Sequence, residues 1–255
     1  MRAVILAGGR GSRLAPYTTV IPKPLMPVGD RPILEIILRQ LRYFHFTQVT
    51  LACGYLADLV RAYVHSSSLC AELNMDLFIE QKPLGTAGAL RSIAGLNSTF
   101  LAMNGDVLTT LDYSRLIAFH HEKKAALTIA VMQREFPVSL GVIHYHEDYT
   151  VHGYDEKPVF RFPVSTGIYV YEPKVLSYIE PDEYLDLPTL TLRLMEAGEL
   201  VVAYPMKDYW LDIGNRDDFE VATKAIEKYA DDLHLEGVQP LTVRPAGAIP
   251  VSPAE

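Results

Sequence analysis

Three glycines and two cations lie close together near the start of the chain. Gly8, Gly9 and Gly11 follow a short apolar segment, and Arg13 and Lys23 come soon after them. Glycines after a strand let backbone N–H groups approach a ligand closely, and N–H groups bind phosphate oxygens. Arginine adds a bidentate fork for phosphate, and lysine adds a compact positive charge. These residues predict a binding site for a nucleoside polyphosphate.

Two common phosphate-binding motifs do not fit this loop. A P-loop needs Gly-Lys-Ser/Thr, which does not follow, and a dinucleotide fingerprint needs a third glycine where Leu14 stands. A tight turn that binds nothing is the alternative for the glycines taken alone. The two cations favour the phosphate site, because Pro22 and Pro24 fix the backbone on both sides of the lysine.

Two aspartates are candidates for holding a divalent cation. Asp106 comes shortly after the apolar run 100–103, and Asp212 stands two residues after the only tryptophan. Ligands of open α/β sheets bind outside the carboxyl ends of the strands, where Asp106 would face the glycine loop. Carboxylates at that edge suit Mg²⁺ beside a polyphosphate. A turn aspartate and a helix N-cap are the alternatives, although Asn215 is better placed than Asp212 to cap a helix.

The elements that must position these residues alternate between strand and helix over the first 110 residues. Apolar or alternating runs predict strands at 4–7, 49–53, 75–79 and 100–103. Helical spacing predicts helices over 33–44, 55–64 and 85–94. This alternation indicates a mainly parallel sheet with right-handed crossovers.

The pattern changes after residue 110. One helix, 113–123, precedes strand-like segments at 127–131, 141–145, 151–154 and 168–171, which indicate antiparallel additions that form a second lobe. Helices are then expected at 174–179, 187–197 and 216–229, and strands at 200–204 and 209–211. We expect one domain over 1–230, with halves 1–110 and 111–230, and a C-terminal extension or disordered tail over 231–255.

Composition excludes several classes of partner. The 255 residues carry a formal net charge of −8 and no cluster of Lys and Arg, which argues against nucleic acid or an anionic membrane. The sequence shows neither a signal peptide nor an apolar run of about 18 residues, so we expect a cytoplasmic protein.

Taken together, these segments resemble the sugar-1-phosphate nucleotidylyltransferases, the NDP-sugar pyrophosphorylase family. The family's leading motif reads Leu-Ala-Gly-Gly-x-Gly-x-Arg-Leu-x-Pro-x-Thr and then Pro-Lys-Pro-Leu-x-Pro-Val, and residues 6–18 and 22–28 match it. Shorter matches follow in the family's order at 83–88, 104–106, 156–158, 165–169 and 210–214. The resemblance implies an α/β fold, with a Rossmann-like mixed, mainly parallel sheet flanked by helices and a smaller antiparallel sugar-binding lobe.

The resemblance also implies a reaction and its residues. An NTP and a sugar 1-phosphate would give an NDP-sugar and pyrophosphate, with Mg²⁺ held by Asp106 and Asp212. The implied nucleotide-binding residues are Leu6, Ala7, Gly8, Gly9, Gly11, Ser12, Arg13, Lys23, Gln81, Gly85 and Thr86. The implied sugar-phosphate-binding residues are Asn104, Gly141, Glu156, Lys157 and Thr166. Arg13, Lys23, Asp106 and Lys157 are the expected catalytic residues, and homo-oligomers are usual in the family.

The choice of base and sugar is less constrained. Residues 84–88 resemble the guanylyltransferase branch, as in GDP-mannose and GDP-heptose pyrophosphorylases, so we expect GTP rather than UTP, dTTP or CTP. Ala89 stands where the mannose enzymes usually have proline. Heptose, mannose, glucose and glucosamine 1-phosphates therefore all stay open, as does a non-sugar phosphate acceptor. A non-catalytic relative is disfavoured, because the loop arginine, both lysines and both aspartates are present.

Overall fold

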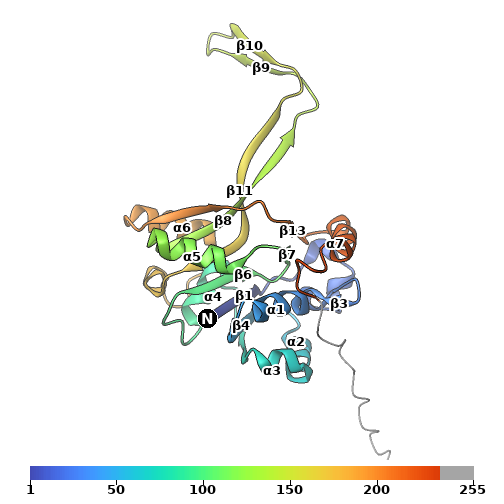
Figure 1. Cartoon of the computed structure of the whole chain (residues 1–255). Helices are drawn as coiled ribbons and strands as arrows, with labels where there is room; N and C mark the ends of the chain where they lie inside the picture. The colour runs from blue at the N-terminus through green and yellow to red at the C-terminus, as the bar shows by residue number, and fades with distance from the viewer. Residues whose placement is uncertain (236–255) are drawn as a thin grey trace, which may run out of the picture.

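The computed structural model describes residues 1–235, which form a central seven-stranded sheet covered by helices (Figure 1). The strands of this sheet are β1 (Arg2–Ala7), β4 (Gln48–Cys53), β5 (Met75–Ile79), β6 (Phe100–Asn104), β8 (Leu127–Pro137), β11 (Val159–Tyr171) and β12 (Val201–Pro205). Their order across the sheet is β12-β8-β11-β6-β1-β4-β5. The site described below therefore lies near the middle of the sheet, where β1 and β6 are neighbours.

The pairing of the strands confirms the mixed, mainly parallel sheet. β1 is parallel to β4 and β6, and β4 is parallel to β5. β11 runs antiparallel to β6 and β8, and β12 returns parallel to β8. Ala3, Val4 and Ile5 of β1 are fully buried, as expected for a strand covered on both faces.

Seven α-helices and four short 3₁₀ segments complete the described body. The helices are α1 (Ile33–Tyr43), α2 (Ala57–Ser66), α3 (Ser68–Glu72), α4 (Gly85–Ser92), α5 (Tyr113–Lys123), α6 (Leu187–Glu196) and α7 (Arg216–Lys228). The 3₁₀ segments are η1 (Ser12–Leu14), η2 (Tyr17–Thr19), η3 (Lys23–Leu25) and η4 (Pro173–Tyr178). The helix expected at 174–179 is thus a 3₁₀ segment. Asn215 caps α7 in a capping box, which leaves Asp212 free of that task.

Three small two-stranded sheets lie beside the central one. They are β2 (Pro27–Val28) with β3 (Arg31–Pro32), β7 (Val107–Thr109) with β13 (Trp210–Asp212), and β9 (Val142–Tyr145) with β10 (Val151–Asp155). The β7–β13 pair matters most for the site, because it sets Asp212 opposite Val107. It also lets the Ile213 N–H donate to the Asp106 carbonyl at 2.9 Å.

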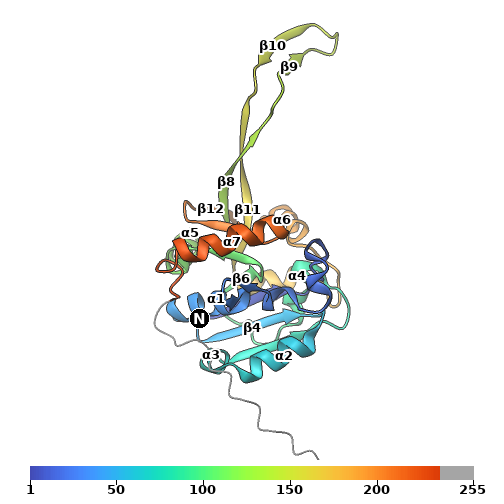
Figure 2. The same cartoon turned by 90° about the vertical axis from the view of Figure 1, so that its right-hand side faces the viewer.

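β8 and β11 continue beyond the sheet as a two-stranded arm, here residues 132–164, which carries the hairpin β9–β10 at its end (Figures 1 and 2). The sequence predicted that the first strand ends at Val131 and that the last begins at Ile168. Both strands are longer, and the expected smaller antiparallel lobe takes the form of an extended arm. Apolar periodicity reports burial, and no residue from 131 to 165 is buried, so the pattern gave no sign of these extensions.

The C-terminal extension expected from residue 231 begins with residues that pack on the body. Leu233 and Leu235 are buried, and the Arg31 guanidinium donates to the Leu235 carbonyl at 3.0 Å. Residues 236–255, on which the rest of that prediction falls, lie outside the described residues. Within residues 1–235, no helix is long and apolar enough to cross a membrane.

Candidate active site

The glycine loop follows β1 directly and shapes one wall of the site. Gly11 has a φ of 63°, in the left-handed region that favours glycine, and it starts η1. Its carbonyl accepts from the Thr18 hydroxyl at 2.8 Å, which ties the loop to η2. A Cβ at Gly214 would lie 3.2 Å from a guanidinium nitrogen of Arg13, so glycine there lets Arg13 lie against the backbone after β13.

Two cations and two carboxylates meet beside this loop. Lys23 at the start of η3 forms an ion pair with Asp106, just after the end of β6, and both side chains are largely buried. Burial raises the pKa of Asp212, and the negative charge of Asp106 adds to this rise. The positive charges of Lys23 and Arg13 oppose this rise, so both cations lie close enough to Asp212 to act on its pKa. The structure therefore brings together Arg13, Lys23, Asp106 and Asp212, which the sequence placed on four separate segments.

The two aspartates fit a divalent cation held together with substrate. Asp106 Oδ1 is buried and has no hydrogen-bond partner among the described residues, so one carboxylate oxygen is available to a ligand. No group of three or more His, Cys, Asp or Glu side chains in residues 1–235 is arranged to hold a metal. Mg²⁺ characteristically binds through one or two carboxylates and the phosphates of a substrate. Asp106 and Asp212 offer the carboxylates, and a substrate would add the phosphates.

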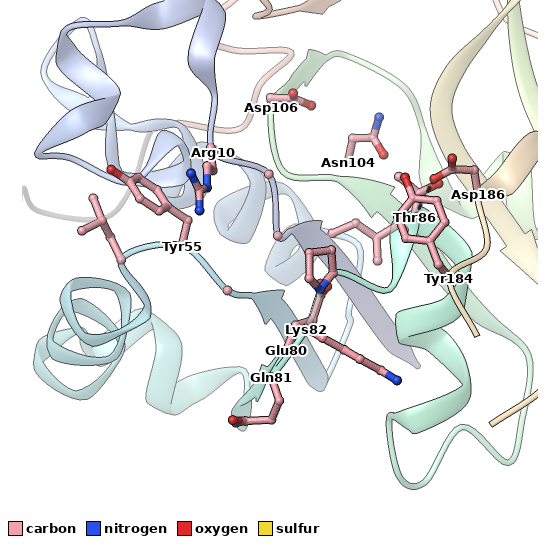
Figure 3. Close-up of a pocket in the computed structure, with 17 residues that line it drawn as sticks. Arg10, Tyr55, Glu80, Gln81, Lys82, Thr86, Asn104, Asp106, Tyr184 and Asp186 are labelled. Carbon is pink, nitrogen blue, oxygen red and sulfur yellow. Dashed lines mark hydrogen bonds between the residues drawn. The ribbon is translucent and has the colours of Figure 1, made fainter. Parts of the chain in front are cut away.

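Two adjoining cavities open around these groups. The smaller, about 260 Å³, is lined by the glycine loop with Arg13, Lys23 and Asp106. The larger, about 760 Å³, extends from Asp106 and Asn104 toward the loops after β4 and β5 (Figure 3). Together they are lined by all eleven residues expected to bind nucleotide: Leu6, Ala7, Gly8, Gly9, Gly11, Ser12, Arg13, Lys23, Gln81, Gly85 and Thr86. The two cavities provide room for a triphosphate beside a nucleoside.

Glu80 lies within the larger cavity, at the end of β5. A Cβ at Gly8 would stand 2.5 Å from Glu80 Oε1, so the glycine makes space for this carboxylate. Glu80 Oε2 accepts from the Leu84 N–H at 3.2 Å, which fixes the orientation of the side chain. Burial raises the pKa of Glu80 above its ordinary value. The result is an oriented, partly buried carboxylate in a cavity of nucleoside size.

The start of α4 closes the larger cavity on the side opposite the loop after β4. The Thr86 N–H donates to Asp186 Oδ1 at 3.4 Å, and the Ala87 and Gly88 N–H groups donate to the Leu185 carbonyl. The Thr86 hydroxyl accepts from the Leu187 N–H at 2.9 Å. These contacts occupy the N–H groups of Thr86, Ala87 and Gly88, so this helix end positions the 183–186 loop.

Sequence reasoning missed several residues that line the larger cavity. They are Arg10, Tyr55, Glu80, Lys82, Tyr184 and Asp186 (Figure 3). Arg10 lies over the ring of Tyr55, with 5.8 Å between the guanidinium carbon and the ring centroid. Arg10 and Glu80 are sequence neighbours of the predicted site residues Gly9, Gly11 and Gln81, so their positions in the sequence could have identified them. Tyr184 and Asp186 arrive through the packing of a distant loop, for which no local pattern exists.

The residues expected to bind the sugar phosphate divide into two groups. Asn104 lines the larger cavity, and a Cβ at Gly167 would lie 2.6 Å from its amide nitrogen, so that glycine leaves room for Asn104. Thr166 is buried, and its hydroxyl donates to the Ala130 carbonyl at 2.8 Å. Gly141, Glu156 and Lys157 lie on the arm, and the structure does not bring them to the cavities of their own chain (Figure 1).

Comparison with known proteins shows the family of this chain. The family model described as "Nucleotidyl transferase" matches residues 2–229. The chain therefore belongs to the nucleotidyl transferase family. Its similar relatives are named as enzymes that act on sugar 1-phosphates. One is the UTP–glucose-1-phosphate uridylyltransferase of Synechocystis, 31% identical over 96% of this chain and 68% of that protein.

Other relatives are named for a different nucleotide. The mannose-1-phosphate guanyltransferase of Schizosaccharomyces pombe is 31% identical over 88% of this chain and 63% of its own length. HddC from Yersinia pseudotuberculosis, solved in complex with GMP-PN, superposes with a TM-score of 0.67 at 26% identity, covering 88% of this chain and 99% of that one. The chain spans about three fifths to two thirds of the length of the curated relatives it matches.

Proposed function

We propose that this chain transfers a nucleotidyl group from a nucleoside triphosphate to a sugar 1-phosphate and releases pyrophosphate. The observation that carries the proposal is the meeting of Arg13, Lys23, Asp106 and Asp212 at the mouth of adjoining cavities of about 260 and 760 Å³. Arginine and lysine bind phosphate oxygens, and the two aspartates are suited to Mg²⁺. The named activities of the relatives agree with this reaction class.

The reaction needs electrostatics and positioning rather than a protein nucleophile. An oxygen of the sugar phosphate attacks the α-phosphorus, and the bond from that phosphorus to the β-phosphate oxygen breaks. The attacking oxygen is already ionised, so no general base is required. Arg13 and Lys23 offset the repulsion between the two anions and hold the triphosphate for in-line attack. Asp106 and Asp212 would hold Mg²⁺, which would supply further positive charge at the phosphates.

We propose GTP as the preferred triphosphate, and Glu80 as the residue that supports this preference. Guanine presents two neighbouring N–H donors, at N1 and N2, which a carboxylate accepts well. Uracil and thymine present one ring N–H between two carbonyl oxygens, and a carboxylate repels those oxygens. Glu80 is oriented by Leu84 within the larger cavity and offers that acceptor pair.

Replacing Glu80 by glutamine tests this choice. Because a hydrogen bond to a charged group contributes about 1.5–3 kcal/mol, we expect kcat/KM for GTP to fall about 10- to 100-fold in Glu80→Gln, with a smaller change for UTP. Initial rates of pyrophosphate release with each triphosphate give the measurement. Glu220→Gln, on the exposed face of α7, is the matched control. Equal losses with both triphosphates would remove the base-selecting role of Glu80.

A substrate matrix tests the function as a whole. GTP, UTP, dTTP, CTP and ATP are each combined with heptose, mannose, glucose and glucosamine 1-phosphates and with phosphocholine, in the presence of Mg²⁺. We expect pyrophosphate release to be highest with GTP and one of the sugar phosphates. Release with phosphocholine but with none of the sugar phosphates would favour the non-sugar acceptor instead. No release in any combination would overturn the proposed function.

A further inference from the structure

The arm exposes more apolar surface than a free two-stranded ribbon would sustain. Ten of the 21 large hydrophobic side chains that are exposed in residues 1–235 lie on the arm: Phe136, Leu140, Ile143, Tyr145, Tyr149, Val151, Tyr154, Val159, Phe160 and Phe162. A contiguous exposed apolar surface marks an interaction site, and an isolated two-stranded hairpin is only marginally stable in water. We therefore expect the exposed apolar side chains of the arm to pack against another protein surface.

Lys157 and Tyr149 are the two non-glycine residues of the arm with a left-handed backbone. Lys157 lies between β10 and β11 with a φ of 48°, in the left-handed region, directly before Pro158. A side chain in that region is strained, and proline disfavours helical conformations in the residue before it. Its ammonium group is exposed and has only a loose ion pair with Glu156, at 3.7 Å. Backbone strain of this kind clusters at ligand-binding sites, and an exposed lysine without a close partner suits an anionic ligand.

The arm holds Lys157 away from the site of its own chain. The β8–β11 ladder runs in unbroken register from Val159 opposite Pro137 to Ser165 opposite Val131, and it is irregular only between Ser165 and Tyr169. Lys157 stands eight residues beyond Ser165, which is about 26 Å of strand. The base of the arm borders the site, because the Trp210 indole donates to the Thr166 carbonyl at 2.7 Å. Both views show the ribbon leading away from the body (Figures 1 and 2).

We propose that two copies of this chain pair so that the arm of each lies over the cavities of the other and presents Lys157 to the sugar phosphate bound there. This inference rests on the proposed function. A second copy accounts for three observations together. The apolar side chains of the arm are exposed in their own chain, Lys157 lies far from Asp106, and no arm residue lines the cavities. A two-fold pair buries the same surface on both copies, so both sites become complete at once.

Complementation between two inactive variants tests the proposal. Asp106→Asn damages the body side of the site, and Lys157→Ala damages the arm side. The two chains are co-expressed with different tags, and the mixed dimer is purified through both. We expect each variant alone to be reduced about 100-fold or more, while the mixed dimer recovers about half of the wild-type rate, because one of its two sites has an intact Asp106 and the partner's Lys157.

The control uses two lesions on the same side. A mixed dimer of Asp106→Asn with Asp212→Asn has a damaged body in both sites, so its rate should stay at the level of the single variants. Thermal unfolding of every variant shows that each has folded. Two results would overturn the exchange of arms, provided that the wild-type protein is active. One is an inactive mixed dimer of the Asp106→Asn chain with the Lys157→Ala chain, and the other is failure to form any mixed dimer. Inactive wild-type protein would instead overturn the proposed function.

Discussion

The two carboxylate oxygens of Asp106 have different surroundings. Oδ2 is paired with Lys23, whereas Oδ1 is buried without a hydrogen-bond partner among the described residues. A buried carboxylate oxygen without a hydrogen-bond partner lowers the stability of the folded protein. Such groups are found where a bound ligand supplies the missing partner. The ion pair with Lys23 thus offsets the charge of Asp106, and Oδ1 is available to a ligand such as the Mg²⁺ that we propose.

Asp106→Asn is expected to lower kcat/KM about 100-fold or more, close to 3 kcal/mol of transition-state stabilisation. The amide removes the charge that attracts Mg²⁺ and also breaks the ion pair with Lys23. Rates of pyrophosphate release at saturating Mg²⁺ provide the measurement. Asp76→Asn, an exposed aspartate on the edge strand β5, is the matched control and should keep the wild-type rate. Near-wild-type turnover in Asp106→Asn would contradict the assigned role.

At the scale of elements, α4 packs tightly against the loop that precedes α6. A Cβ at Gly88 would overlap the carbonyl oxygen of Glu183. Because that atom belongs to the backbone, the loop must move as a whole to admit a methyl group. The Ala87 and Gly88 N–H bonds to Leu185 would be distorted at the same time.

Gly88→Ala should therefore destabilise the protein by about 2 kcal/mol, within the 1–3 kcal/mol typical of overpacking. For a domain of this size, that corresponds to a fall in Tm of roughly 4–8 °C. Gly54→Ala is the control, because a Cβ at Gly54 meets no atom closer than 3.8 Å. Calorimetry of both variants gives the comparison, and equal Tm values would show that the loop adapts without cost.

α5 carries a buried histidine that links it to the sheet. His120 is 1% exposed, and its ring nitrogens lie 2.7 Å from Thr128 Oγ1 and 3.2 Å from Glu172 Oε1. Burial lowers the pKa of His120, although Glu172 partly opposes this shift and His121 adds to it. The native state therefore binds fewer protons at this position than the unfolded state does.

This difference predicts a pH dependence of stability. As the pH falls below about 6.5, the unfolded chain takes up the proton first, so the free energy of unfolding decreases until the lowered native pKa is reached. Between pH 7.5 and 5, the Tm of the wild type should fall more steeply than that of His120→Gln, which cannot titrate there. Parallel curves would mean that His120 contributes nothing to the acid sensitivity.

The sequence predicted the elements of the body well because their burial leaves a pattern. Apolar runs marked β1, β4 and β6, and contiguous motifs marked the glycine loop and Asp106. Two things had no such signal. The strands predicted at 141–145 and 151–154 are β9 and β10 at the end of the arm, but the arm is solvent-exposed in its own chain, so no alternation of buried and exposed residues identified the extended parts of β8 and β11. Tyr184 and Asp186 reach the cavity only through tertiary packing, which residue spacing does not encode.

At the scale of the whole molecule, the body and the arm are separable units. Within residues 1–235 the body holds every buried residue, and from 131 to 165 the core is contacted only by the partly buried Met132. Replacing residues 138–158 with a two-residue turn should therefore leave a cooperatively unfolding protein, which we expect to be a monomer. Calorimetry and light scattering test both points. Loss of the cooperative transition would show that the arm is needed for folding.

The separation of the arm from the core also affects how the sequence can change over generations. A substitution in the body must preserve packing around fully buried residues such as Ile5 and Leu51. Residues 131–165 are constrained differently, because none of them is buried within its own chain. In the two-fold pair that we propose, one substitution on the arm would appear on both copies and alter both sites at once.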